Sequence, residues 1–90
     1  MRAIVTVFGL DRPGIIARVS GVLFAANINI LDISQTVLRD KFFAMTMLVD
    51  IGESTLSFDG VKQRLDECAE ELKMDIRFQR EEIFNSMHRV

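Results

Sequence analysis

Tryptophan and tyrosine are absent from this 90-residue sequence, and cysteine, proline and histidine occur once each. The single cysteine, Cys68, excludes an internal disulfide and any metal site built from several thiolates. No apolar run reaches the roughly 18 residues that a membrane-spanning helix needs. Basic residues are not in excess either, since 11 lysines and arginines stand against 13 aspartates and glutamates. The resulting net charge of −2 argues against a surface for nucleic-acid phosphates.

The residues that are abundant are those of a small folded domain. Hydrophobic residues make up 49% of the chain and charged residues 27%, which is too apolar for a disordered protein. The length predicts one domain that covers residues 1–90. The first residues alternate in polarity and lack the basic flank and apolar block of a secretory signal, so we expect a cytoplasmic protein.

Hydrophobic periodicity predicts six elements in the order strand, helix, strand, strand, helix, strand. The expected strands are 3–8, 28–38, 42–49 and 74–80. Pro13 fits the start of the first helix, which ends near Asn27, and Ser57 is a candidate cap for the second helix. Apolar residues at helical spacing in the tail, Ile83, Phe84 and Met87, predict a short C-terminal helix.

This order predicts an α+β sandwich of the ferredoxin-like βαββαβ type, with one four-stranded antiparallel sheet and two helices on one face. The first and third strands are expected at the centre, because both of their faces are apolar, and the other two at the edges. In the second strand, the odd-numbered residues from Asn29 to Val37 form the more apolar set, and we expect them to point into the core. Its register with the third strand stays open, because the turn at 39–41 can hold two or three residues.

Two helices cover only one face of such a sheet, although the central strands carry apolar residues on both faces. A second copy of the chain is the simplest cover for the open face, so we expect a homodimer. Face-to-face packing of two sheets covers this face directly and is favoured on that ground. An edge-to-edge pair that continues the sheet and the helical layer satisfies the same apolar pattern.

The segment from Asp11 to Gly14 has the chemistry of a small-molecule site. A helix amino-terminus offers unpaired N–H groups and partial positive charge to a carboxylate, and Gly14 admits a ligand close to the backbone. Asp11 could hold an ammonium group, so the loop could bind both ends of an α-amino acid. The alternative is that Asp11 only caps the helix or orders the turn.

Asn29 and Asp32 lie near the start of an expected edge strand. The Asn29 amide offers a donor and an acceptor, which suits a zwitterion, but turn chemistry explains it equally well. Asp32 is a candidate contact for the same ligand. The alternative is that it is a solvated charge that blocks edge-to-edge aggregation. Met45 and Met47 are expected in the core, and the lone His88 does not predict a metal site, so no cofactor is expected.

Residues 5–17, VTVFGLDRPGIIA, and 27–30, NINI, closely resemble the start of an ACT domain. The tail 83–90, IFNSMHRV, resembles the end of a family of small free-standing ACT-domain proteins of bacteria and archaea. The chain is also similar to the amino-terminal half of the glycine-cleavage repressor type of regulator, and to the regulatory segment of formyltetrahydrofolate deformylase.

The resemblance implies a regulatory module that binds amino acids or related small molecules and pairs side by side or sheet to sheet. It places the ligand between the first loop of one copy and the second strand of its neighbour. By position, the contact residues would be Asp11, Arg12, Gly14, Ile15, Asn27 and Asn29. The family often has glycine where this chain has Asn27: asparagine can replace a glycine that only ends the helix, but not one that makes room for the ligand. A metabolic enzyme or a transcription regulator would be the controlled partner.

Three other functions fit the same strand order less well. An acylphosphatase-like hydrolase would use Arg12 and Asn29, but Pro13 removes an N–H from the loop and no nucleophile–base pair is visible. An RNA-binding module would use Phe42 or Phe43 but needs more basic surroundings. Metal transport would need cysteines in the first loop. We therefore expect no catalysis, no nucleic acid and no membrane partner, and a module that only dimerises remains a further alternative.

Overall fold

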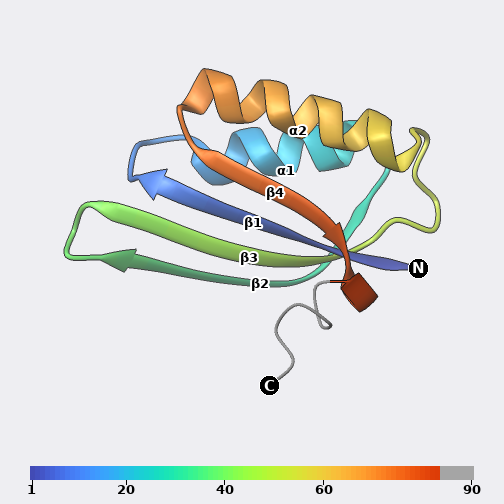
Figure 1. Ribbon diagram of the computed structural model, residues 1–90, viewed down its shortest axis with the longest axis horizontal. Helices are drawn as coiled ribbons and strands as arrows, with labels where there is room; N and C mark the ends of the chain where they lie inside the picture. The colour runs from blue at the N-terminus through green and yellow to red at the C-terminus, as the bar shows by residue number, and fades with distance from the viewer. Residues whose placement is uncertain (84–90) are drawn as a thin grey trace.

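Strands and helices alternate along the chain in the predicted order. The computed structural model describes residues 1–83, with β1 (Arg2–Leu10), α1 (Ile15–Ala25), β2 (Asn29–Leu38), β3 (Phe42–Asp50), α2 (Phe58–Leu72) and β4 (Asp75–Arg80). Both helices lie on one side of the sheet (Figure 1). One helical turn at 81–83 follows β4, whereas Phe84, Met87 and His88 lie outside the described residues. The prediction of a ferredoxin-like α+β sandwich is confirmed.

The sheet has the strand order β2-β3-β1-β4, and all neighbouring strands are antiparallel. The central positions of β1 and β3 and the edge positions of β2 and β4 are as predicted. Leu38 pairs with Phe42, so the turn between β2 and β3 holds three residues. Arg39 and Asp40 in this turn have positive φ angles of 53° and 57°. This turn sets the register that the sequence pattern leaves open.

The core lies between the helices and one face of the sheet. The central strands supply seven of its residues, each at most 4% exposed: Ala3, Val5, Val7, Phe43, Met45, Met47 and Val49. The helices supply the facing layer: Ile15, Val19, Leu23, Val61, Leu65, Cys68 and Leu72. The two methionines of β3 are therefore core residues, as expected.

The opposite face of the central strands is also apolar, but unevenly so. Phe8, Leu10 and Phe42 are 50%, 54% and 38% exposed and gather near the β2–β3 turn. The rings of Phe8 and Phe42 stack with their centroids 6.0 Å apart. The middle of this face carries the threonines Thr6 and Thr46 instead. The expected second apolar face exists, and its exposed part is concentrated at one end.

A β-bulge interrupts β2 at Leu31. Ile30 pairs with Val49 and Asp32 pairs with Leu48, so Leu31 is the additional residue on the edge strand. Directly opposed residues in an antiparallel pair point to the same face, so Ile30 lies on the helix side of the sheet with Val49. The residues of β2 that face the helices are therefore even-numbered before the bulge and odd-numbered after it.

The prediction that the odd-numbered residues of β2 all point into the core is wrong. Ahead of the bulge, the even-numbered Ile28 and Ile30 pack toward the core instead of Asn29. Beyond the bulge, Ile33 and Val37 do face the helix side, opposite Met47 and Phe43. Each is nevertheless 44% exposed, because the helices do not fully cover this edge of the sheet.

The two helices begin in different ways. Ser57 caps α2 as predicted, since its Oγ accepts a hydrogen bond of 3.1 Å from the Gly60 N–H. Asp59 lies in the first turn of α2, near the positive end of the helix dipole. At the start of α1, Gly14 has a φ angle of 87° and no side chain caps the helix. Of the two helices α1 and α2, α1 therefore presents the uncapped first turn.

Replacing Ser57 with alanine removes the α2 cap, and we expect the free energy of unfolding to fall by about 1 kcal/mol. Ser57→Asp should retain most of the stability, because its carboxylate can accept the same bond. Urea denaturation followed by circular dichroism measures both variants. Equal losses for alanine and aspartate would contradict a capping role.

Cys68 is 3% exposed on the core-facing side of α2, and burial raises the pKa of its thiol. The nearby Arg18 guanidinium counteracts this rise without cancelling it. We therefore expect the thiol to stay protonated near neutral pH and to react far more slowly with an aromatic disulfide reagent in the native protein than in urea. Equal reaction rates in the two states, measured by absorbance at pH 8, would show that the thiol is accessible.

Candidate functional site

The predicted site residues fall into two groups at opposite ends of the sheet (Figure 1). The loop after β1 lies beside the β2–β3 turn, because the Asp11 N–H donates to the Lys41 carbonyl at 2.7 Å. Asn27 and Asn29 follow α1 at the other end, where Asn29 pairs with Asp50. A nine-residue strand is roughly 30 Å long, so one chain keeps the two groups well apart.

The loop at the first end surrounds the start of α1. Gly14 holds the left-handed N-cap position, and α1 has no side-chain cap and no acidic residue in its first turn. The interpretation of Asp11 as a helix cap is therefore wrong. The first-turn N–H groups have no acceptor within the helix and carry partial positive charge. This end of α1 suits an anion.

Arg12 adds a second positively charged group to this end of the chain. Its Nε atom is buried and has no hydrogen-bond partner among the described residues. A buried donor without an acceptor costs free energy, so such an atom next to an uncapped helix start marks a place for an acceptor such as a carboxylate. Ile15, the remaining predicted contact residue of this loop, is only 2% exposed, so its side chain belongs to the core.

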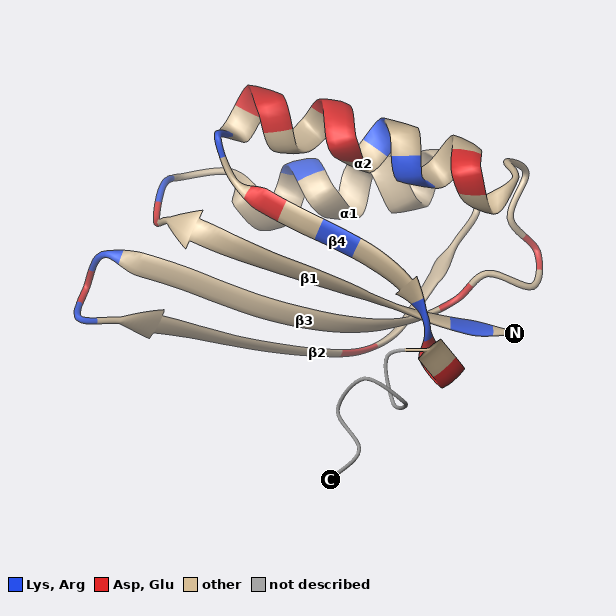
Figure 2. Cartoon of the chain, viewed as in Figure 1, with Lys and Arg blue, Asp and Glu red and all other residues tan. Residues whose placement is uncertain are grey.

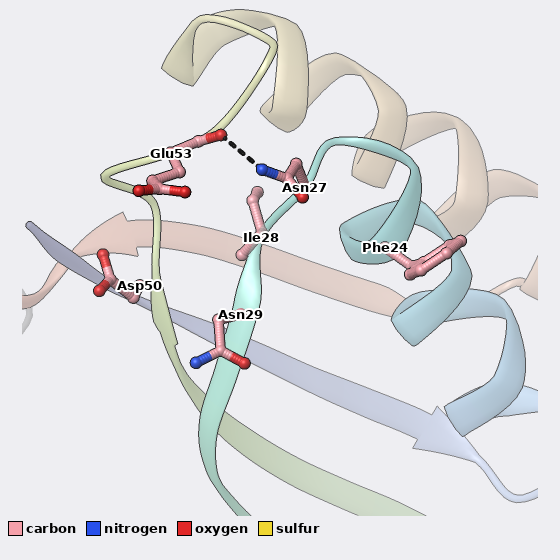
Figure 3. Close-up of a pocket in the computed structure, with 6 residues that line it drawn as sticks. All are labelled: Phe24, Asn27, Ile28, Asn29, Asp50 and Glu53. Carbon is pink, nitrogen blue, oxygen red and sulfur yellow. Dashed lines mark hydrogen bonds between the residues drawn. The ribbon is translucent and has the colours of Figure 1, made fainter.

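A cavity of about 360 Å³ opens at the second end. It is lined by Phe24, Asn27, Ile28, Asn29, Asp50 and Glu53 (Figure 3). Asn27 has a φ angle of 59°, the left-handed conformation expected after a helix, and its Nδ2 donates to the Glu53 carbonyl at 3.1 Å. The Asn27 side chain therefore ties the α1–β2 turn to the β3–α2 loop.

The side chains of Asn29 and Glu53 are exposed and make no hydrogen bond within residues 1–83. Asp50 is partly engaged, because its Oδ1 accepts the Gly52 N–H at 2.9 Å and lies 3.7 Å from the Met1 ammonium. Sequence reasoning missed Asp50 and Glu53. The one signal that could have found them is the position of their loop, which follows β3 at the end of the sheet where β2 begins.

Asp32 belongs to neither group. It lies beyond the bulge on the open face of β2, opposite Leu48, and its Oδ1 accepts the N–H of Ile33 at 2.9 Å. The structure therefore brings together Asp11, Arg12 and Gly14 at one end and Asn27 and Asn29 at the other, but leaves Asp32 between them.

The described part of the chain gives little support to metal binding, nucleic-acid binding or membrane insertion. Within residues 1–83 there is no group of three or more His, Cys, Asp or Glu side chains that could hold a metal ion. The strands β1, β2 and β3 carry few charged residues and no basic patch, and α2 carries most of its acidic residues toward its C-terminal half (Figure 2). None of the described helices is both long and apolar enough to span a bilayer.

Comparison with known proteins identifies the family. The model of the ACT domain matches residues 2–79. A UPF0237 protein of Methanopyrus kandleri is 53% identical over 89 residues, which cover 99% of this chain and 98% of that protein. The solved structure of an ACT domain protein from Streptococcus pneumoniae has a TM-score of 0.79 at 37% identity, with 93% of each chain covered. A candidate glycine cleavage system transcriptional repressor has a TM-score of 0.74 at 25% identity, covering 88% of this chain and 44% of that one.

The family match spans most of the described chain, and a relative more than half identical spans nearly all of it. The resemblance that rests on the Asp11–Gly14 loop and on Asn27 and Asn29 is confirmed. The chain belongs to the ACT domain family.

Proposed function

We propose that this protein is a regulatory module that binds an amino acid or a related small molecule as a homodimer, without catalysis of its own. The observation that carries the proposal is the buried, unpartnered Nε of Arg12 beside the uncapped start of α1. Arg12 closely precedes the start of α1 in the sequence, both groups favour an anion, and the described chain supplies no acceptor for either. A ligand carboxylate would satisfy both.

The second chain is needed because the predicted contact residues lie at opposite ends of one copy. A two-fold axis perpendicular to the sheet that pairs β2 with the partner's β2 makes the two strands antiparallel. The partner's Asn29 then lies at the end of the assembly that carries Asp11 and Arg12 of the first copy. Edge-to-edge pairing therefore brings the two halves of the site to the same end, in agreement with the composite site that the family resemblance implies.

The β2 edge has the surface such a pair requires. Its backbone is unpaired on one side, and Ile33 and Val37 are each 44% exposed next to it. A groove of about 530 Å³ runs between α1 and β2. Small residues of α1 form part of its wall, and Phe24 beside them is 86% exposed. Small residues at Ala17, Ser20 and Gly21 allow a second helix to approach closely.

Face-to-face packing of two sheets would cover the exposed Phe8, Leu10 and Phe42. In that arrangement, however, the helical layers lie on the outside, so the start of α1 stays away from the partner, although Asn29 and Asp50 themselves occupy open-face positions of β2 and β3. The distribution of the site residues therefore favours the edge-to-edge pair over the arrangement that hydrophobic pattern alone favours.

The acylphosphatase alternative loses its main support in this geometry. It requires Arg12 and Asn29 around one phosphoryl group, but the two residues lie at opposite ends of the chain. The dimerisation-only alternative differs from the proposal in one respect, namely that no small molecule binds.

Thermal-shift screening of the twenty amino acids, followed by calorimetry of the best binders, tests the proposal. Arg12→Gln removes the positive charge of the guanidinium, so we expect it to weaken binding of the best amino acid by about tenfold or more. Arg64→Gln makes the same charge change on the exposed side of α2 and should leave the affinity unchanged. Absence of binding by all twenty would leave a dimerisation module, and release of phosphate from benzoyl phosphate would support the hydrolase.

Sedimentation at micromolar protein tests the edge-to-edge homodimer. Ile33→Lys places a charge beside the β2 edge and should yield monomers, whereas Thr46→Lys places the same charge on the open face and should leave the dimer intact. The reverse pattern would support face-to-face packing. A wild-type monomer under these conditions would contradict both arrangements.

A further inference from the structure

We infer that a cavity between the start of α2 and the end of β4 binds a small carboxylic acid with a compact apolar body, and that Arg80 holds its carboxylate. At the end of the molecule where the N-terminus lies, α2 begins and β4 ends, far from the loop that carries Arg12 (Figure 1). The cavity is separate from the proposed amino-acid site, so the inference goes beyond the proposed function and can hold or fail without it.

The cavity has the size of a small apolar molecule. Its volume is about 170 Å³, and its apolar wall comes from the β3–α2 loop, from α2 and from β4: Ile51, Leu56, Phe58, Val61 and Phe78. An apolar cavity of about 150 Å³ in another protein holds one benzene molecule. A single aromatic ring or a short branched chain therefore fits this space.

Two polar side chains, Ser54 and Arg80, also line the cavity. The Ser54 hydroxyl donates to the Leu56 carbonyl at 2.8 Å and accepts the Leu56 N–H at 3.2 Å. The turn of the β3–α2 loop therefore engages the Ser54 hydroxyl. Arg80 is the side chain that remains to bind a polar group of a ligand.

The guanidinium of Arg80 differs from those of the arginines near it. Arg2 pairs with Glu81 at 2.9 Å, and Arg77 lies 3.5 Å from Asp75. Arg80 is partly buried, and within residues 1–83 its guanidinium forms neither an ion pair nor a hydrogen bond. A guanidinium offers parallel N–H donors that match the two oxygens of a carboxylate. The cavity therefore has a cation available for an anionic group.

Aromatic packing orients Arg80 before any ligand arrives. The Arg80 Cζ lies 4.5 Å from the centroid of the Phe58 ring, and this ring stacks on Phe78 with the centroids 4.4 Å apart. A guanidinium held against a ring keeps its N–H edge open, and an ordered side chain loses less entropy when it binds. The alternative is that Arg80 only packs on Phe58, and this alternative predicts no ligand.

The polarity of the cavity favours an acid without an amino group. Neither aspartate nor glutamate is among the described residues that line it. An ammonium group beside the bound carboxylate would lie near the Arg80 cation and against an apolar wall, which costs free energy. Benzoate and isovalerate represent the expected class of ligand, whereas a zwitterionic amino acid does not fit it.

NMR titration of the wild-type protein with benzoate and with isovalerate tests the inference. We expect saturable shifts of the methyl signals of Ile51, Leu56 and Val61, which line the cavity. Benzamide has the shape of benzoate without its charge and should bind at least about tenfold more weakly. Valine, which is isovalerate with an added amino group, should also bind this cavity more weakly than isovalerate.

Variants of β4 test the role of Arg80. Arg80→Gln removes the cation and should weaken benzoate binding by about tenfold or more. Arg80→Lys keeps the charge without the paired donors and should give an intermediate affinity. Arg77→Gln makes the same charge change on the opposite face of β4 and should leave the affinity unchanged. Thermal unfolding verifies that each variant is folded.

Three results would overturn the inference: no saturable shift at Val61 with either acid, equal affinity for benzoate and benzamide, or unchanged benzoate affinity in Arg80→Gln. Benzoate that shifts Gly14 instead of Val61, and that loses affinity in Arg12→Gln, would also overturn it, because the acid would then bind at the start of α1. The wild-type titrations decide the question even if a variant of Arg80 fails to fold. Calorimetry with amino acids tests the proposed function separately.

Discussion

The packing of α1 across the sheet determines where every candidate functional group lies. The helix leaves β1 at one end of the molecule and returns the chain to β2 at the other, and its buried Ile15, Val19 and Leu23 hold it there. The residues before and after the helix therefore cannot meet within one chain. A site that used residues from both groups would therefore need a second copy of the chain.

Much of the fold was predictable because it depends on local periodicity and on the apolar character of whole strands. The doubly apolar β1 and β3 indicated the central positions, and Ser57 indicated the cap of α2. The bulge at Leu31 was not predictable, because no glycine or proline marks it and adjacent apolar residues hide the change of parity. The register of β2 depends on left-handed angles at Arg39 and Asp40, which residues other than glycine adopt only in particular contexts.

The candidate site was predictable only where one short segment contains it. The Asp11–Gly14 loop and Asn29 were found from their sequence neighbours. The unpartnered Nε of Arg12 and the cavity residues Asp50 and Glu53 depend on which segments pack together. A polar loop between a strand and a helix has no periodicity of its own, so its role becomes visible only when the end of α1 is placed beside it.

The hydrogen bond from the Asp11 N–H to the Lys41 carbonyl couples the loop after β1 to the tip of the β2–β3 hairpin. A molecule that displaces the loop would therefore break this bond or move the tip of the hairpin with the loop. If two chains associate along that strand, occupancy of the loop and strength of association become linked quantities, and each changes the other by the same factor. A controlled enzyme or regulator would then need no direct contact with the small molecule, because it could respond to the change in the interface between the two chains.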